Sequence, residues 1–198
     1  MCRFSTPTAC GRRSSRTRSS EAAPVSSGFS AGRDGSVIAE FEAAEVSLLR
    51  SLVSMLLGLV SPGETSDDPL ERALGIGSAK APTDPVLARL FPSAYEDEQE
   101  ASEFRRYTEA TLRDGKRADA QTVLDTARSG RAELTPEQAQ AWLRSLNDVR
   151  LTLGTKLDVT EEVHDEIAMM SEDDPRYPAY VTYDWLTYLQ DSLVRALW

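Results

Sequence analysis

The side chains with the most evident chemical reactivity are two cysteines near the start of the chain. Cys2 and Cys10 are separated by seven residues, and Arg3, Arg12 and Arg13 lie beside them. Neighbouring positive charge favours the thiolate, which is the reactive form of cysteine. A flexible segment would let the two sulfur atoms approach to disulfide distance. We therefore consider a reversible or intermolecular disulfide here, against the alternative of two exposed thiols that a cytosol keeps reduced.

The other residue types form no catalytic or metal-binding pattern in the sequence. The chain has one histidine, His164, and two cysteines, which are too few for a structural zinc site, a Cys/His protease or a disulfide scaffold. Glu161 and Asp165 flank His164 at helical spacing, so we weigh a weak divalent-metal cluster against a solvated acidic loop and favour the loop. The remaining acidic pairs lack a nucleophile and a Gly-rich phosphate loop. We expect no enzyme activity, no metal and no cofactor.

Five polar residues fall on two strongly apolar predicted helices. They are Asn147, Asp148 and Arg150 on one helix and Asp184 and Gln190 on the other. Arg150 could form a salt bridge with Asp184 across the helix interface, and Asn147 could cap a backbone group. Such a cluster would either dock a partner or small ligand, or fix the register of the two helices, and we favour the second role.

Aromatic side chains gather in the same two helices. A binding surface is one interpretation, but helical spacing directs most of them inward and favours core packing. Trp198 is the exception, because an exposed terminal tryptophan would suit an interface anchor. The other members of the group are Trp142, Trp185, Tyr183 and Tyr188.

Charge is unevenly distributed along the chain. Residues 1–35 hold six arginines and two acidic residues, a net of +4, and since the whole chain carries −10, residues 36–198 carry −14. A body of that charge repels nucleic acid and anionic membranes, so we expect action through protein partners. The arginines of the first segment could still contact phosphates, which leaves direct DNA binding open. The most apolar run, Val46–Val60, is shorter than the roughly 18 residues that a membrane span needs, and it carries Arg50.

The first 35 residues are predicted to form a disordered basic tail. They are rich in serine and arginine and poor in large apolar residues, so they cannot bury enough surface to offset the entropy of ordering. The absence of an apolar stretch argues against a secretory signal. An organelle transit peptide has a similar composition, but an apolar helical stripe is missing here.

Hydrophobic periodicity predicts a mainly α-helical domain over residues 36–198, a compact bundle of about five helices with a possible short two-stranded β ribbon. Asp114-Gly115 should break or kink the longest helix, whose predicted apolar face includes Phe104, Tyr107 and Leu112. The expected strands are 36–41 and 130–134, and the expected helices are 43–59, 85–90, 98–127, 135–154 and 179–197, with short helical segments near 69–74 and 161–169.

The predicted strand–helix units resemble each other. Ala39-Glu40-Phe41 precedes a helix with Leu-Arg-Ser-Leu at 49–52, and Ala132-Glu133-Leu134 precedes a helix with the same four residues at 143–146. A lone strand leaves backbone groups unpaired. We therefore consider a structural duplication in which the two strands pair and hold the two helices together, with chance similarity as the alternative.

Several longer motifs together resemble a known family. They are Glu45–Leu52 with Leu56–Leu59, Asp84–Pro92 with Ala94-Tyr95, Glu103–Arg106, Trp142–Leu151 with Leu153-Gly154, and Tyr183–Leu186 with Leu189-Gln190. In this order they are similar to an actinomycete family of domains of unknown function, number 2017, over residues 36–198.

The resemblance implies a cytoplasmic, mainly helical, redox-responsive transcriptional regulator. Such a protein would act with RNA polymerase or a sigma factor, on genes of cysteine biosynthesis and in oxidative stress. Family genes commonly neighbour a Clp adaptor and a cysteine-synthesis cluster, which gives the alternative of a non-enzymatic adaptor linked to Clp proteolysis or sulfur metabolism. Both cysteines lie outside the resembling region, and the chain from Gly11 onward has none, so a thiol sensor inside the helical domain is excluded.

Overall fold

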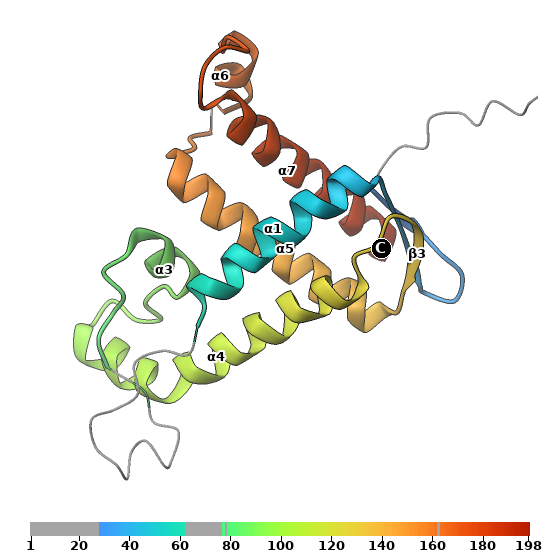
Figure 1. Ribbon diagram of the computed structural model, residues 1–198. Coiled ribbons are helices and arrows are strands. Elements are labelled where there is room, and N and C mark those ends of the chain that lie inside the picture. Colours follow the sequence, from blue (N-terminus) through green and yellow to red (C-terminus); the bar gives the residue numbers. More distant parts are fainter. Residues whose placement is uncertain (1–27, 62–76, 78, 162) are drawn as a thin grey trace, which may run out of the picture.

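The structure is a computed structural model that describes residues 28–61, 77, 79–161 and 163–198. The expected helical turn near 69–74 and the segment with Cys2 and Cys10 lie outside these ranges. The described residues form six helices and one three-stranded sheet (Figure 1). The helices are α1 (Ala43–Leu59), α3 (Pro85–Leu90), α4 (Glu98–Thr126), α5 (Pro136–Leu157), α6 (Val163–Met169) and α7 (Tyr177–Leu197). The predicted mainly helical fold is confirmed, and none of the described helices is long and apolar enough to cross a membrane.

The sheet contains one strand more than the predicted ribbon. Strands β2 (Val37–Phe41) and β3 (Gly130–Leu134) match the expected positions, and β1 (Gly28–Ala31) pairs antiparallel with β2 on its other side. β1 falls inside the segment predicted to be a disordered tail to residue 35, so that boundary is wrong. The reason is tertiary: the Phe29 side chain is buried, and its backbone N–H donates to Ser192 Oγ of α7 at 3.3 Å.

The pairing of β2 with β3 supports the internal repeat. Ala39 lies opposite Ala132, the equivalent residue of the other unit. The helix after each strand begins with a capping box, formed by Glu42 and Glu45 in the first unit and by Thr135 and Gln138 in the second. The expected strand pair is confirmed. A common origin of the two units stays a prediction.

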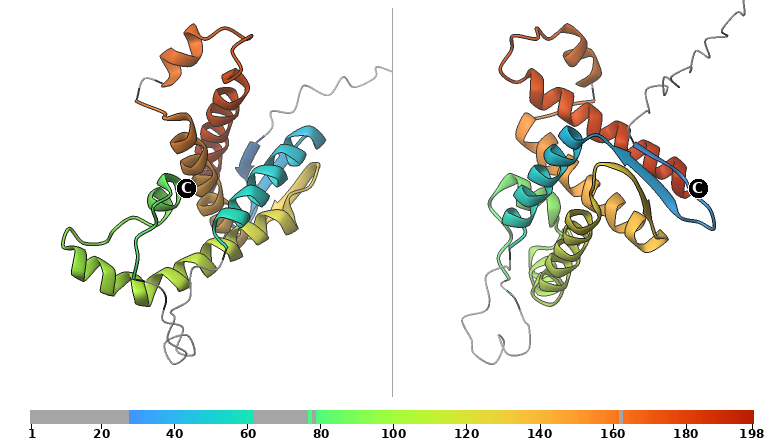
Figure 2. Two further views of the ribbon diagram at one scale, coloured as in Figure 1. Left: turned by 60° about the vertical axis from the view of Figure 1, so that its left-hand side comes forward. Right: turned by 45° about the vertical axis from the view of Figure 1, so that its right-hand side comes forward.

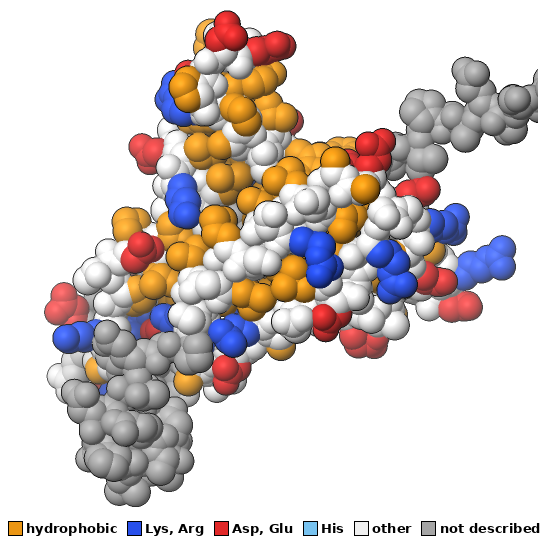
Figure 3. Space-filling model, in the orientation of Figure 1, with side chains coloured by type: hydrophobic (Ala, Val, Ile, Leu, Met, Phe, Trp, Pro, Cys, Tyr) orange, Lys and Arg blue, Asp and Glu red, His pale blue; other side chains and the backbone are white. Residues whose placement is uncertain are grey.

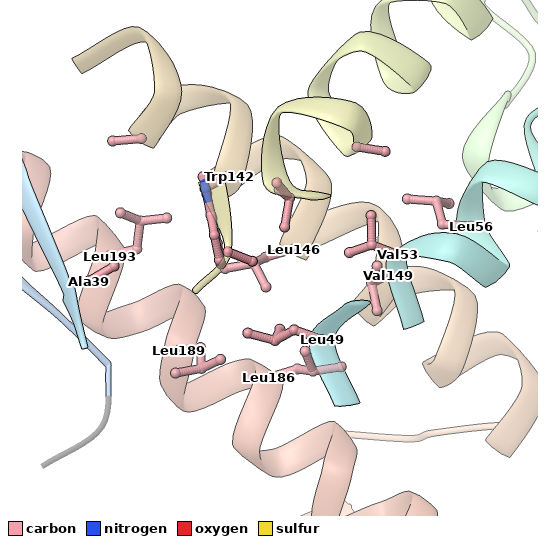
Figure 4. Close-up of a cluster of buried hydrophobic side chains, with 14 of the residues drawn as sticks. Ala39, Leu49, Val53, Leu56, Trp142, Leu146, Val149, Leu186, Leu189 and Leu193 are labelled. Carbon is pink, nitrogen blue, oxygen red and sulfur yellow. The ribbon is translucent and has the colours of Figure 1, made fainter. Parts of the chain in front are cut away.

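The core lies where α1, α5 and α7 meet, and buried residues of the sheet and of α4 complete it (Figure 4). Leu49 of α1 lies near Leu186 of α7, whereas Val53 of α1 lies near Val149 of α5 (Figure 4). Burial of each leucine side chain stabilises the fold by about 1.5–3 kcal/mol relative to exposure. This is the part of the structure in which apolar periodicity alone determines which side chains are buried.

Trp142 joins the helical core to the sheet. Its ring stacks on Phe41 at 5.8 Å between centroids and meets the edge of Phe29 at 5.4 Å, and its Nε1–H donates to Thr126 Oγ1 at 2.8 Å. The prediction that the aromatic residues pack in the core is confirmed for Trp142. It is wrong for Tyr188, which is 47% exposed.

α4 is a single unbroken helix that passes through Asp114-Gly115, so the expected break is wrong. Asp97 caps its start by accepting hydrogen bonds from the backbone of Gln99 and Glu100. A glycine inside a helix costs about 1 kcal/mol relative to alanine. The ion pairs of Arg113 and Lys116, on either side of Asp114-Gly115, offset this cost. One end of α4 lies beside the strands and the other lies far from them (Figure 2).

α5 is longer than predicted, because Gly154 does not end it. A Cβ at Gly154 would lie 3.0 Å from the Tyr183 ring of α7. The glycine therefore serves the close approach of α5 and α7. The helix ends instead at Asp158, which adopts a left-handed conformation with φ of 53°.

Candidate functional site on the long helix α4

Two buried arginines flank one glutamate on the N-terminal half of α4. Glu109 accepts from Arg105 through one carboxylate oxygen and from Arg113 through the other, at 2.8 Å in each ion pair. Both arginines are only 7% exposed. The residues occur at i, i+4 and i+8, so one helical face presents all three. Buried charges need such partners because their removal from water is costly.

The arginines also connect α4 to the segments that surround it. Arg105 donates to the backbone oxygen of Phe91 at 3.2 Å, and Arg113 donates to the backbone oxygen of Ser61 at 3.0 Å. The Arg113 guanidinium lies 4.5 Å from the centroid of the buried Phe91 ring, at a distance typical of cation–π contact. This half of α4 is therefore held by charged side chains against the ends of α1 and α3.

The C-terminal half of α4 contacts α5 through two further ion pairs. Lys116 Nζ lies 2.7 Å from Asp148 Oδ1. Arg144 forms a bidentate salt bridge with Asp119, in which Nε and Nη2 each donate to one carboxylate oxygen at 2.7 Å. Burial raises the pKa of Asp148, and the hydrogen bond from Lys116 offsets part of that rise. The hydrogen bond to Asp119 raises the pKa of Arg144.

The polar cluster predicted from sequence is divided between two places. Asp148 points to Lys116 of α4, while Asn147 and Arg150 lie on the side of α5 that faces α7. There Gln190 Nε2 donates to Asn147 Oδ1 at 3.4 Å. This contact joins α5 to α7, and the expected capping of a backbone group by Asn147 stays a prediction. A shared role for all five residues, in docking or in helix register, stays a prediction.

Arg150 contacts an aromatic ring on α7. Its guanidinium carbon lies 5.9 Å from the centroid of Tyr183, the residue next to Asp184. The Arg150 Nε and Gln190 Oε1 atoms are buried without a hydrogen-bond partner. The salt bridge expected between Arg150 and Asp184 stays a prediction.

Several other candidates from the sequence fall outside the described residues. Cys2 and Cys10 precede the described ranges, and the side chains of His164 and Asp165 are also outside them. Within the part of the chain that is described, no three His, Cys, Asp or Glu side chains are grouped as metal ligands.

An open cavity of about 620 Å³ lies between the end of α5, α6 and the start of α7. Its wall combines apolar side chains, such as Leu157 and Tyr180, with the ion pair between Asp174 and Arg176. Hydrogen bonds from Arg176 lower the pKa of Asp174. The lining also includes Asp158, and its described residues form no group of metal ligands, so it points to no particular class of ligand.

The outer surface of the N-terminal half of α4 is the most unusual feature of the described residues. Phe104, Tyr107 and Leu112 were predicted to form the apolar face of the helix, but they are 43%, 65% and 51% exposed. Tyr95 is 47% exposed and meets the edge of Phe104 at 5.6 Å. We call the surface formed by Tyr95, Phe104, Tyr107 and the exposed acidic residues beside them the acidic–aromatic face; the acidic members are Glu96, Asp97, Glu98, Glu100 and Glu103.

Sequence reasoning missed both this exposure and the buried arginines. Its assumption was that the more apolar face of α4 is buried. The alternation Arg105, Glu109, Arg113 at four-residue spacing was available as a signal, because it places opposite charges in contact along one face. What the sequence did not show is that Phe91 and the end of α1 would offer an aromatic ring and a backbone oxygen to those arginines.

Elsewhere on the surface, hydrophobic side chains remain visible beside α1 and on the arm formed by α6 and α7 (Figure 3). Met169 of α6 is 81% exposed, and Trp198 is 84% exposed, as predicted for the terminal tryptophan. These residues are scattered, which is normal for a protein surface. The acidic–aromatic face differs because its aromatic side chains adjoin one another. Tyr95 meets the edge of Phe104, and Tyr107 lies about one turn further along α4.

A family model and several relatives each match most of this chain. The sequence model of a family described as a domain of unknown function (DUF2017) matches residues 26–197. The chain is 36% identical to a putative oxidative stress regulator AosR of Mycobacterium leprae, and 32% identical to the oxidative stress regulators AosR of Mycobacterium bovis and Mycobacterium tuberculosis. Each match covers 96% of this chain and 98% of the relative. No solved structure matches.

Proposed function

Because the chain belongs to the DUF2017 family, we propose that it is a redox-responsive transcriptional regulator that acts through RNA polymerase or a sigma factor. Its target genes serve cysteine biosynthesis during oxidative stress. The observation that carries the proposal is similarity to proteins named oxidative stress regulators over 96% of this chain and 98% of their length. Those names support a regulatory role in oxidative stress; the polymerase or sigma-factor mechanism is the finer part of the proposal.

Charge and packing favour a protein-binding regulator over an enzyme or a protein that reads DNA bases. Residues 36–198 carry −14, which repels the phosphate backbone. The buried charges Arg105, Arg113 and Asp148 each contact another charged side chain. They therefore stabilise helix packing, whereas a catalytic group needs access to a substrate.

The redox response is assigned to Cys2 and Cys10, because the chain has no other cysteine. In a cytoplasm both thiols stay reduced until an oxidant appears. Hydrogen peroxide would take two electrons and two protons from the pair, leaving one disulfide and two molecules of water. Nearby arginines favour the thiolate that begins this reaction.

A transcription assay with purified components tests the proposal. Reduced and peroxide-treated protein would be added to RNA polymerase and a sigma factor on a cysteine-biosynthesis promoter. We expect transcript yield to change with the oxidised protein, and the change to be lost in Cys2→Ser/Cys10→Ser. The double variant Ser5→Ala/Ser14→Ala is the matched control in the same segment and should keep the response.

The same components separate this proposal from its alternatives. Promoter DNA should be retained by the protein only when polymerase is present, and tight sequence-selective binding by the protein alone would contradict the mechanism. An unchanged transcript yield, together with co-purification of a Clp component from both oxidised and reduced cells, would instead favour the adaptor linked to proteolysis.

A further inference from the structure

The N-terminal half of α4 buries charge and exposes aromatic surface, which is the reverse of the usual arrangement. Arg105 and Arg113 are each 7% exposed, whereas Phe104 and Tyr107, on the same helix, are 43% and 65% exposed. A helix normally places its apolar stripe toward the core. Clustered aromatic side chains on a surface mark sites where another macromolecule binds.

The charge around these aromatic residues is strongly negative. Five exposed acidic residues lie between positions 96 and 103. The basic residues nearest to them on α4 are Arg105, which is buried and paired with Glu109, and Arg106, which is half-buried. Acidic side chains at the start of a helix are stabilised by the helix dipole, but the dipole does not require Phe104 and Tyr107 to remain exposed.

We propose that the acidic–aromatic face binds a positively charged, amphipathic segment of a partner protein. The aromatic residues would cover the apolar side of that segment, and the acidic residues would face its lysines and arginines. Opposite charges around an apolar centre accelerate association and select against acidic partners. This inference rests on the proposed function, in which the protein acts through a protein partner, and it assigns that contact to one face of the molecule.

Other occupants fit these residues less well. Nucleic acid and anionic membranes would meet the acidic side chains with like charge. A second copy of the chain that bound with the same face would oppose the same acidic residues to each other. The arginine-rich residues 1–27 have the right charge, but their large apolar side chains are limited to Met1, Phe4 and Val25, whose spacing gives no apolar face to cover the aromatic residues.

A defined peptide probe tests the proposal even though the partner is unidentified. The probe is a fluorescein-labelled helix of lysine and leucine, about five turns long, with leucines at i, i+3, i+4 and i+7. Its control has glutamate in place of every lysine. Binding of each peptide to the full chain would be measured by fluorescence anisotropy at low and at physiological ionic strength, and hydrogen exchange would identify the protected residues.

Three variants locate the binding site. Phe104→Ala/Tyr107→Ala should weaken binding of the lysine peptide about tenfold, as expected for the loss of central aromatic contacts. Glu98→Gln/Glu100→Gln/Glu103→Gln should weaken it at low ionic strength and reduce its dependence on salt. Val181→Ala/Trp198→Ala also removes two exposed apolar side chains, which are 42% and 84% exposed, and should leave the affinity unchanged. Circular dichroism would establish that all three variants are folded.

The outcomes distinguish a failure of the proposed binding surface from a failure of the proposed function. Protection of residues 95–112 by the lysine peptide, together with the expected order of variants, supports the surface. Equal binding of the glutamate peptide, or an equal loss of affinity in the Val181/Trp198 control, overturns it whatever the transcription assay shows. A surface that passes these tests while transcription does not respond to the protein would refute the proposed function alone.

Discussion

The two halves of α4 are held in the structure by different kinds of interaction. The C-terminal half buries Ala120 and Val123 and packs on α5 beside Trp142. The N-terminal half is anchored by Arg105 and Arg113, through Glu109 and two backbone oxygens. One helix can therefore be part of the core at one end and a charged support for an exposed surface at the other. The comparison predicts that changes in the two halves affect stability differently.

The largest effect is expected from Trp142→Ala. The side chain is completely buried, contacts Phe29 and Phe41, and donates to Thr126. Loss of a buried tryptophan leaves a cavity and costs about 3–5 kcal/mol. Urea unfolding followed by circular dichroism would measure the change in the free energy of unfolding. Trp198→Ala, at an exposed tryptophan, is the control and should change it by no more than about 0.5 kcal/mol.

A smaller and more local effect is expected from Arg113→Ala. The substitution removes the donor to Ser61 and one partner of Glu109, which keeps its bond to Arg105. A lost hydrogen bond to a charged group costs about 1.5–3 kcal/mol. Hydrogen exchange should accelerate in residues 98–113 more than in residues 116–126. Uniform acceleration along α4 would show that the two halves are one cooperative unit and would contradict the comparison.

The two halves also differ in how far sequence alone predicts them. The buried C-terminal half follows from hydrophobic periodicity, as do the positions of α1 and α5, because their apolar residues recur at helical spacing. The spacing of Phe104 and Tyr107 fits the same apolar pattern, which predicts that they are buried. That prediction is wrong, because both side chains are exposed. Their exposure depends on the competing burial of Arg105 and Arg113, which needs partners that are distant in sequence.

Prediction from sequence also failed at β1 and within the polar cluster, and for a similar reason: the outcome depends on partners elsewhere in the fold. β1 was missed because residues 28–31 form a strand only against β2 and α7, and four residues carry too little local signal. The polar residues of α5 and α7 were found by type, but Asp148 and Asn147 point to different neighbours. Spacing along a helix gives the face of a residue, while its partner depends on how the helices cross.

The third prediction concerns pH and the contact between the C-terminal half of α4 and α5. Burial raises the pKa of Asp148 above its ordinary value of 3.8, despite the opposing effect of Lys116. The folded state therefore binds more protons than the unfolded state in the pH range just above 3.8. The contribution of this group to stability is greatest below that range and falls as pH rises through it to the folded pKa.

Asp148→Asn removes that titration, so the variant should lose less stability than the wild type as pH rises from about 4 to 7. Urea unfolding at a series of pH values would compare the two slopes. Asp114→Asn, at an exposed carboxylate of α4, is the control and should retain the slope of the wild type. If stability changed with pH in the same way in Asp148→Asn and in the wild type, the pKa of Asp148 would not be raised by burial, which would contradict this prediction.

The smallest effect on stability is expected from Tyr107→Ser, although it removes a large aromatic side chain from α4. Tyr107 is 65% exposed, and substitutions at exposed positions usually change the free energy of unfolding by no more than about 0.5 kcal/mol. Serine and tyrosine have similar helix propensities, so the substitution adds no large change through the helix backbone. Thermal and urea unfolding of Tyr107→Ser and Val123→Ala would compare one residue from each half of α4. A loss in Tyr107→Ser as large as that in Val123→Ala, whose side chain is fully buried, would mean that Tyr107 contributes to folding rather than to binding, and the distinction between the two halves would fail.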